Sequence, residues 1–139
     1  MYLLDTNIIS ELMDPPGASA VLSWADSVDL WDQFTTALSQ AEVLYGLAIM
    51  PKGRKRTDRI TWADQMFAED FRGRILPFDQ HAASHYADLL SSRRSLGRRL
   101  DTIDAQIAAV ARANGMAVVT RNTKDFEDCG IDLIDPWQV

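Results

Sequence analysis

Residues 1–13 read MYLLDTNIISELM, and the order of residue types in this stretch predicts both a fold and a site. The apolar residues Tyr2–Leu4 predict a short buried strand, and the spacing of apolar residues within 8–13 predicts a helix directly after it. Asp5 stands between the two elements. A carboxylate in this position has two interpretations: it can cap the following helix, where Asp is favoured, or it can bind a metal ion.

The alternation of strand and helix continues along the chain. We expect further strands at 34–37, 74–78, 116–120 and 131–135. We expect helices around 21–25, at 39–50, 55–71, 81–96 and 102–114, with the first helix stopped by DPPG at 14–17. In the helix at 39–50, the expected core residues are Leu44, Leu47 and Ala48. This order predicts an α/β fold in which helices cover both faces of a mostly parallel sheet, and the 139 residues fit one domain, 1–139.

Composition limits the possible functions. A net charge of −6 argues against nucleic-acid binding through overall charge, so such binding needs local basic clusters. The single cysteine, Cys129, excludes an internal disulfide and is expected to be a small buried apolar residue. No apolar run approaches the roughly 20 residues that span a bilayer, and the first residues do not form a signal peptide. We therefore expect a cytoplasmic protein without membrane contact.

Acidic and amide residues follow the predicted strands. Asp5 ends the first strand, Glu42 lies in the first turn after the second, and Asp104 opens the alanine-rich helix. Asn122 and Asp125 follow the fourth strand. In open parallel sheets, ligands bind beyond the carboxyl ends of the strands. A doubly wound sheet would therefore bring these residues together at one edge.

Each position also has a purely structural explanation. Asp5 and Asp101 can be helix N-caps, and Asp125 can start a short turn. Ser39 and Glu42 have the spacing of a capping box, S-x-x-E. Such caps are common, so no single one of these residues indicates a site.

The combined pattern favours a metal site. Asp104 shares its helical face with the apolar residues three, four and seven positions later, so its carboxylate should point inward. Gly46 costs its helix about 1 kcal/mol relative to alanine, which predicts a close backbone approach beside Glu42. Gathered carboxylates raise one another's pKa and need a cation to compensate them. Oxygen ligands without cysteine favour Mg²⁺ or Mn²⁺, and neutral oxygens would come from Asn7, Thr120 and Asn122.

Four stretches resemble, in order and spacing, the motifs of PIN-domain ribonucleases. They are LLDTNIISEL (3–12), SQAEVLYG (39–46), DTIDAQIAAVA (101–111) and VVTRNTKDF (118–126). The likeness is to VapC-type toxins of bacterial toxin–antitoxin pairs, including the FitB-like branch, and it extends to DPW at 135–137. It implies a three-layer α/β/α sandwich, PIN-like, that carries a Mg²⁺- or Mn²⁺-dependent endoribonuclease site. It also implies a homodimer and a cognate VapB-like antitoxin, with operator DNA bound only through the antitoxin.

The resemblance also implies roles for individual residues. Asp5, Glu42 and Asp104 match the three core acids that bind the metal and catalyse hydrolysis. The fourth acid is at the position of Asn122 in some relatives, whereas others have N-x-x-D-F as here, so we expect Asp125 to complete the site. The polar residues that orient the ligands are expected to be Thr6, Asn7, Ser39 and Thr120, with Asn122 as a neutral neighbour. Asp101 is a weaker acidic candidate.

Two basic clusters could bind RNA despite the acidic total. The stretches 52–56 and 93–99 hold eight of the 14 basic residues. They can neutralise phosphates, they can be a solvated helix end and an exposed loop, or, by the resemblance, they can receive the antitoxin. The residues expected to contact RNA or antitoxin are Arg54, Lys55, Arg98, Arg99 and Arg121.

Other features have plainer explanations. The four tryptophans are expected in the core or at interfaces. His81 and His85 have the spacing of a zinc-binding helix but no matched third ligand, so structural or surface roles are expected.

Two other functions stay open. The first is a PIN-like binding or regulatory module with reduced catalysis that acts through an antitoxin, which the neutral Asn122 favours. The second is a phosphotransfer domain, either a response-regulator receiver or a haloacid-dehalogenase-like phosphatase. The phosphatase requires an acid two residues after Asp5, where this chain has Asn7. The receiver requires paired acids and a late lysine, and neither is evident.

Overall fold

The computed structural model describes residues 1–14 and 17–139, so the prolines of the predicted helix stop at 15–16 lie outside the described residues. Its centre is a five-stranded sheet in the order β3-β2-β1-β4-β5, and every strand pair is parallel. The strands are β1 (Tyr2–Leu4), β2 (Gln33–Thr36), β3 (Ile75–Leu76), β4 (Ala117–Val119) and β5 (Leu133–Ile134). This arrangement confirms the predicted α/β fold. The central strand is β1, so Asp5 follows the middle of the sheet.

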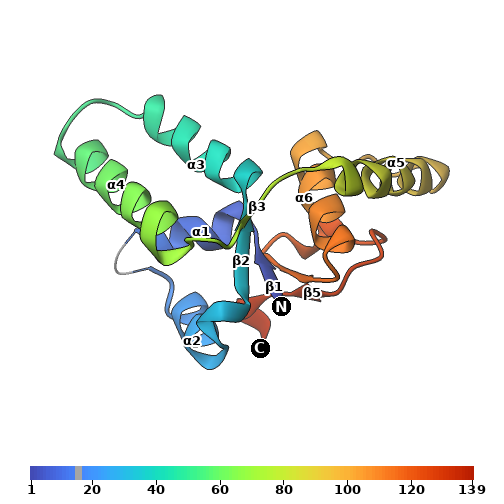
Figure 1. Ribbon diagram of the computed structural model, residues 1–139, viewed down its shortest axis with the longest axis horizontal. Coiled ribbons are helices and arrows are strands. Elements are labelled where there is room, and N and C mark those ends of the chain that lie inside the picture. The colour runs from blue at the N-terminus through green and yellow to red at the C-terminus, as the bar shows by residue number, and fades with distance from the viewer. Residues whose placement is uncertain (15–16) are drawn as a thin grey trace.

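Helices cover both faces of this sheet (Figure 1). They are α1 (Thr6–Met13), α2 (Ser19–Ser27), α3 (Ala37–Ala48), α4 (Arg54–Gln65), α5 (Gln80–Ser95) and α6 (Thr102–Ala113). Leu4 packs in a core with buried residues of α1 to α4, whereas Leu3 packs in a second core with α5 and α6. Neighbouring residues of a strand point to opposite faces. The residue pair at the centre of β1 therefore contributes to both cores.

The face that α3 presents to the core differs from the prediction. Leu47 is buried as expected, but Leu44 is 43% exposed and Ala48 is exposed as well. Val43 is the second apolar residue of α3 that is buried. The buried stripe contains Val43 in place of Leu44, because the packing of α3 against the core decides which side of the helix is buried.

The start of α3 also corrects the predicted capping box. Thr36 is the N-cap, and its hydroxyl oxygen accepts a hydrogen bond from the Ser39 amide at 3.0 Å. The predicted close approach at Gly46 is wrong, because a Cβ built on this residue would have no heavy atom within 4 Å. Gly46 is exposed and lines an open groove beside Glu42.

The long helix predicted at 55–71 is interrupted. Its regular part, α4, ends at Gln65, and a π-helical turn at Met66–Asp70 follows. The tryptophans also separate into different environments: Trp24 is buried, while Trp31 is 71% exposed. Cys129 is buried as predicted. Of the helices in residues 1–14 and 17–139, none is long and apolar enough to cross a membrane.

Candidate active site

Asp5 is held by three hydrogen bonds at the carboxyl end of β1. Its Oδ1 accepts the Thr6 amide at 2.8 Å, which makes Asp5 the N-cap of α1. Its Oδ2 accepts the Thr120 hydroxyl at 2.8 Å and the Asn7 side-chain amide at 3.1 Å. The carboxylate is therefore a helix cap and is also tied to the end of β4. Both interpretations of this residue are compatible with its position.

Burial raises the pKa of Asp5 above its ordinary value. The hydrogen bonds from Thr120, Thr6 and Asn7 act in the opposite direction because they favour the charged form, and the negative charge of Glu42 raises the pKa further. The effect of Glu42 indicates that the cap of α1 and the second turn of α3 bring the two carboxylates near one another.

A short hydrogen bond joins these two helices directly. The Thr6 hydroxyl donates to Oε1 of Glu42 at 2.6 Å, and the same hydroxyl lies 3.0 Å from Oγ of Ser39. Ser39 is fully buried, whereas Glu42 is half-buried. Thr6 therefore orients the Glu42 carboxylate, a contact between residues 36 positions apart. No local sequence signal predicted it.

Asp104 lies in the first turn of α6, next to the N-cap Asp101, whose Oδ1 accepts the Ile103 amide at 3.0 Å. Asp104 is half-buried, while Ile107, Ala108 and Ala111 on the same stripe are fully buried. Burial is the main reason why the pKa of Asp104 rises to about 7. Negative charges raise it further, in the order Asp5, Asp101, Asp125 and Glu42. Because such charges act over short distances, Asp5, Glu42 and Asp125 lie near Asp104 although they come from three other segments of the chain.

Asp125 and Asn122 lie in and before a 3₁₀ turn at Thr123–Phe126, and both are exposed. The Asn122 amide donates to the Thr120 hydroxyl at 3.0 Å, and the Asp125 amide donates to the Asn122 carbonyl at 3.0 Å. Buried Phe126 anchors the turn. Asp125 is thus the residue of this loop whose charge acts on Asp104.

The carboxylates lie near one another, but they are not arranged as a set of metal ligands. In the part of the chain that the structure describes, no three His, Cys, Asp or Glu side chains are grouped so that they could hold a metal ion. The groups whose charges act on Asp104 are nevertheless all carboxylates, and their negative charge adds to burial in raising the pKa of Asp104. This donor chemistry fits a hard divalent cation.

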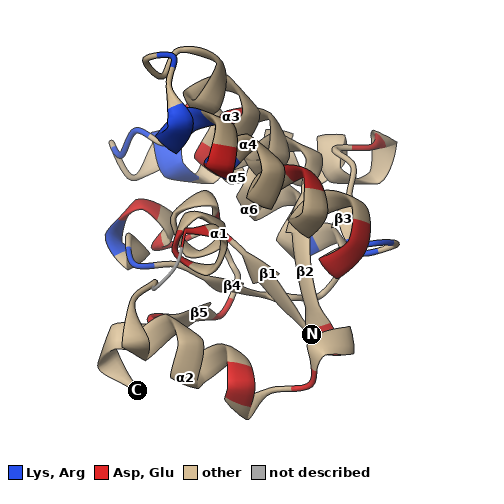
Figure 2. Ribbon diagram, turned by 90° about the vertical axis from the view of Figure 1, so that its left-hand side faces the viewer, with Lys and Arg blue, Asp and Glu red and all other residues tan. Residues whose placement is uncertain are grey.

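The expected RNA-contact residues have different environments. Arg54 and Lys55 are exposed at the start of α4, and Arg99 is exposed in the loop after α5. Arg98 is half-buried and forms ion pairs with Glu127 at 3.1 Å and with Asp128. Basic segments lie at the start of α4 and in loops beside α1, on the left of Figure 2.

Arg121 is exposed and lies next to the proposed site. Its guanidinium stacks over the Trp137 ring at 4.5 Å, and its amide donates to Oδ1 of Asn7 at 3.4 Å. The two histidines lie near the start of α5 with ring centroids 5.1 Å apart, and His81 is exposed. The predicted surface role therefore fits His81.

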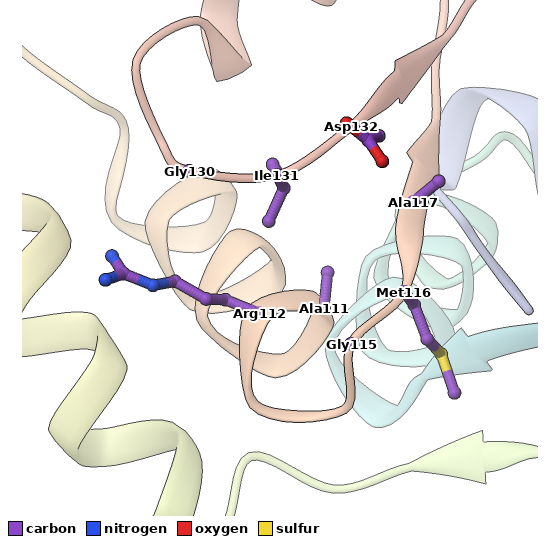
Figure 3. A pocket seen from close by; sticks show the side chains of 8 residues that line it. All are labelled: Ala111, Arg112, Gly115, Met116, Ala117, Gly130, Ile131 and Asp132. Atoms are coloured by element: carbon purple, nitrogen blue, oxygen red, sulfur yellow. The ribbon is translucent and has the colours of Figure 1, made fainter.

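Two hollows differ in their relation to the acids. A groove between α1, α3 and α4 is lined by Thr6 and Glu42, with the ion pair Arg59–Asp14 (2.6 Å) at its side. A pocket of about 470 Å³ lies where α6 ends and β4 begins, with Arg112, Ala117 and Asp132 among its lining residues (Figure 3). Asp104 is at the other end of α6. The groove, and not this pocket, is therefore adjacent to the acids.

Comparison with known proteins is consistent with this geometry. The sequence pattern of the PIN domain family matches residues 2–131. The chain is 40% identical over 138 residues to VapC ribonuclease Y4jK of Sinorhizobium fredii and 36% identical over 137 residues to toxin FitB of Neisseria gonorrhoeae; each match covers 99% of both chains. The solved structure of FitAB bound to the IR36 DNA fragment contains a chain with 36% identity and a TM-score of 0.92, and the match covers 100% of this chain and 97% of that one.

Proposed function

The chain belongs to the PIN-domain family, and from this premise we propose that it is a divalent-metal-dependent endoribonuclease, the toxin of a type II toxin–antitoxin pair. Full-length similarity to proteins named VapC ribonuclease and toxin FitB supports the proposal. The observation that carries it is that acids from three other segments, Asp5, Glu42 and Asp125, lie near enough to Asp104 for their charges to raise its pKa. A metal-dependent hydrolysis of phosphodiesters uses such oxygen ligands, because they hold the cation that balances the charge of the phosphate.

The residues proposed to hold the metal are Asp5, Glu42, Asp104 and Asp125. Their oxygens suit Mg²⁺ or Mn²⁺, which when bound supplies a Lewis acid that activates water and neutralises developing charge on the phosphate. Asp5 is restrained by Thr120 and Asn7, and Glu42 by Thr6. These uncharged partners hold the carboxylates in place and leave their negative charge available to the metal ion.

Asp104 has a second proposed role. Its carboxylate is proposed to accept the proton that the attacking water loses, which an Asp104 oxygen then holds. The pKa of about 7 belongs to the metal-free protein, and a bound cation would lower it by favouring the charged form. Ser39 and Asn122 act only through their contacts with Thr6 and Thr120.

The RNA strand is proposed to lie across exposed basic side chains near the acids. Arg121 precedes Asn122, and Arg99 precedes the cap of α6. Exposed guanidinium groups position a strand by contacting its phosphates. Arg98 contributes less in this scheme because it is already paired with Glu127 and Asp128.

We also propose a cognate VapB-like antitoxin and a homodimer. The groove lined by Thr6 and Glu42 leads to the acids, so a segment of the antitoxin seated there would block them. The exposed apolar residues Leu44, Tyr45 and Ile49 on α3 provide a surface that suits contact with a protein. Operator DNA is proposed to be bound through the antitoxin only.

One observation supports the reduced-activity module as a second candidate. Within the described residues, no three potential ligands are already grouped as a metal site. Titration calorimetry with Mn²⁺ separates the two candidates. A nuclease binds the ion and loses this binding in Asp5→Asn, whereas a binding module without a metal site gives no heat of binding.

The test of the nuclease uses purified protein and labelled single-stranded RNA with Mg²⁺, with Mn²⁺ or with a chelator. We expect metal-dependent cleavage that Asp5→Asn and Asp104→Asn each abolish. Asp88→Asn is the matched control, because Asp88 is an exposed carboxylate on α5 away from these contacts. Cleavage by the Asp5→Asn, Asp104→Asn double variant at the wild-type rate would show that the site is assigned wrongly.

A further inference from the structure

Arg93 is a buried cation whose side chain joins two loops. It lies near the end of α5 and is only 3% exposed. One terminal nitrogen donates to the Glu127 carbonyl, and the other donates to the Arg99 carbonyl at 2.9 Å. Burying a guanidinium is costly unless it is well paired. The retention of Arg93 inside the fold therefore calls for an explanation beyond packing.

The two acceptors belong to the segments that carry acids of the proposed site. Arg99 comes two residues before Asp101, which caps α6 and precedes Asp104. Glu127 directly follows the 3₁₀ turn that contains Asp125. The charges of Asp101 and Asp125 both act on Asp104. One guanidinium thus connects the loop before Asp104 with the loop that carries Asp125.

We propose that Arg93 is a positioning residue that fixes Asp125 relative to Asp104, an inference that rests on the function proposed above. Asp125 is exposed on a four-residue 3₁₀ turn, of which Phe126 is the buried residue. Through the Glu127 carbonyl, Arg93 restrains the end of this turn, and through the Arg99 carbonyl it restrains the entry to α6. The distance between the two acids then depends on this double hydrogen bond.

The chemistry of the side chain explains why arginine is required. The guanidinium holds its donors in a rigid planar fork, so it can bind two carbonyls in fixed directions. A lysine ammonium keeps the charge but has no such fork. Arg98 provides a comparison, since it pairs with the side chains of Glu127 and Asp128 from a more exposed position. Its ion pairs hold side chains, whereas Arg93 holds the backbone.

The test compares Arg93→Lys with the control variant Arg72→Lys, which makes the same replacement at an exposed arginine. Partners of metal ligands typically contribute 10- to 100-fold to metal affinity. We therefore expect Arg93→Lys to weaken Mn²⁺ binding, measured by calorimetry, by about 10-fold or more. The Mn²⁺ concentration for half-maximal RNA cleavage should rise in parallel, while KM for RNA at saturating Mn²⁺ stays within about twofold, because the basic phosphate contacts are unchanged. Arg72→Lys should change neither quantity beyond about twofold, because Arg72 is exposed and lies outside the proposed site.

A double-variant comparison tests whether the effect acts through Asp125. Adding Asp125→Asn to Arg93→Lys should weaken Mn²⁺ binding no further than Asp125→Asn does alone, because residues that act as a unit are not additive. If the decreases in Mn²⁺ affinity caused by the two substitutions multiply in the double variant, the proposal is wrong. A folded Arg93→Lys variant with wild-type Mn²⁺ affinity would overturn it as well, even if its thermal stability is lower.

Two further results keep the test decisive. If Arg93→Lys does not fold, hydrogen exchange of the wild type replaces it: the amides of Ile103 and Asp125 should open with the same free energy, and independent opening overturns the proposal. If wild-type protein neither binds Mn²⁺ nor cleaves RNA, the proposed function fails together with this inference. Failure of the inference alone leaves wild-type metal binding and cleavage intact.

Discussion

The replacement Asp104→Asn should make the metal-free protein more stable at alkaline pH. The folded protein raises the pKa of Asp104 from 3.8 to about 7, and each pKa unit corresponds to about 1.36 kcal/mol. The full shift therefore corresponds to about 4 kcal/mol as an upper limit. Asp104 is only half-buried, and solvent screening reduces this destabilisation to roughly 1–3 kcal/mol. Asparagine removes it because it carries no charge at any pH.

The sign of the pH dependence follows from proton binding. Between about pH 4 and 7, folded Asp104 holds a proton that the unfolded chain has released. The contribution of Asp104 to the free energy of unfolding therefore falls as pH rises, by at most about 1.4 kcal/mol per pH unit. This loss of stability is absent below the pKa that Asp104 has in the unfolded chain, and it is complete above the pKa that Asp104 has in the folded protein. Asp104→Asn should match the wild type near pH 4 and exceed it near pH 8.

The assay is urea unfolding in the presence of a chelator, followed by tryptophan fluorescence, at about pH 4.5, 6 and 8. Asp88→Asn is the matched control, since it removes an exposed carboxylate of α5 and should change stability by less than about 0.5 kcal/mol. A metal arm completes the experiment. At 100 times its dissociation constant a ligand stabilises a protein by about 2.7 kcal/mol, and Mg²⁺ should give this gain to the wild type but not to Asp104→Asn. The reasoning is refuted if Asp104→Asn is no more stable than the wild type at pH 8.

Three further predictions concern single contacts and one surface. Thr6→Val should reduce RNA cleavage at least about 10-fold while Thr6→Ser retains it, because only the hydroxyl orients Glu42; equal activity of the two variants contradicts this. Gly46→Ala should raise the free energy of unfolding by about 0.5–1 kcal/mol, since a Cβ there meets open space. A lower free energy of unfolding in urea would contradict this and indicate a steric clash at Gly46. Leu44→Glu should shift the protein from dimer to monomer in sedimentation, with folding retained, because Leu44 is exposed on α3; an unchanged dimer excludes this face as the interface.

The sequence was sufficient to predict the order of elements and the family. The apolar run before Asp5 and the alternation of strands with helices predicted a parallel sheet, and the sheet confirms it. The placement of Glu42 in the helix after β2 and of Asp104 in the first turn of α6 followed from the same pattern. Their roles as metal ligands stay predictions.

Contacts between distant segments were not predictable from the sequence. Leu44 and Val43 both fit a helical pattern, and only the packing of α3 decided that Val43 is the buried residue. Arg93 looked like part of a basic surface cluster, yet it is buried with its donors on two loops. Each outcome depends on which segments meet in space, and no local spacing encodes that.

By itself, the sequence determined the strand–helix order, the acids that follow the strands and membership of the PIN-domain family, since these depend on residue type and spacing along the chain. Only the tertiary structure decided the partners of Asp5 and Glu42, the rise in the pKa of Asp104 and the burial of Arg93. The physical reason is that burial, charge interaction and hydrogen bonding depend on distances in space, which are set when β1, α3, α6 and the 3₁₀ turn pack together.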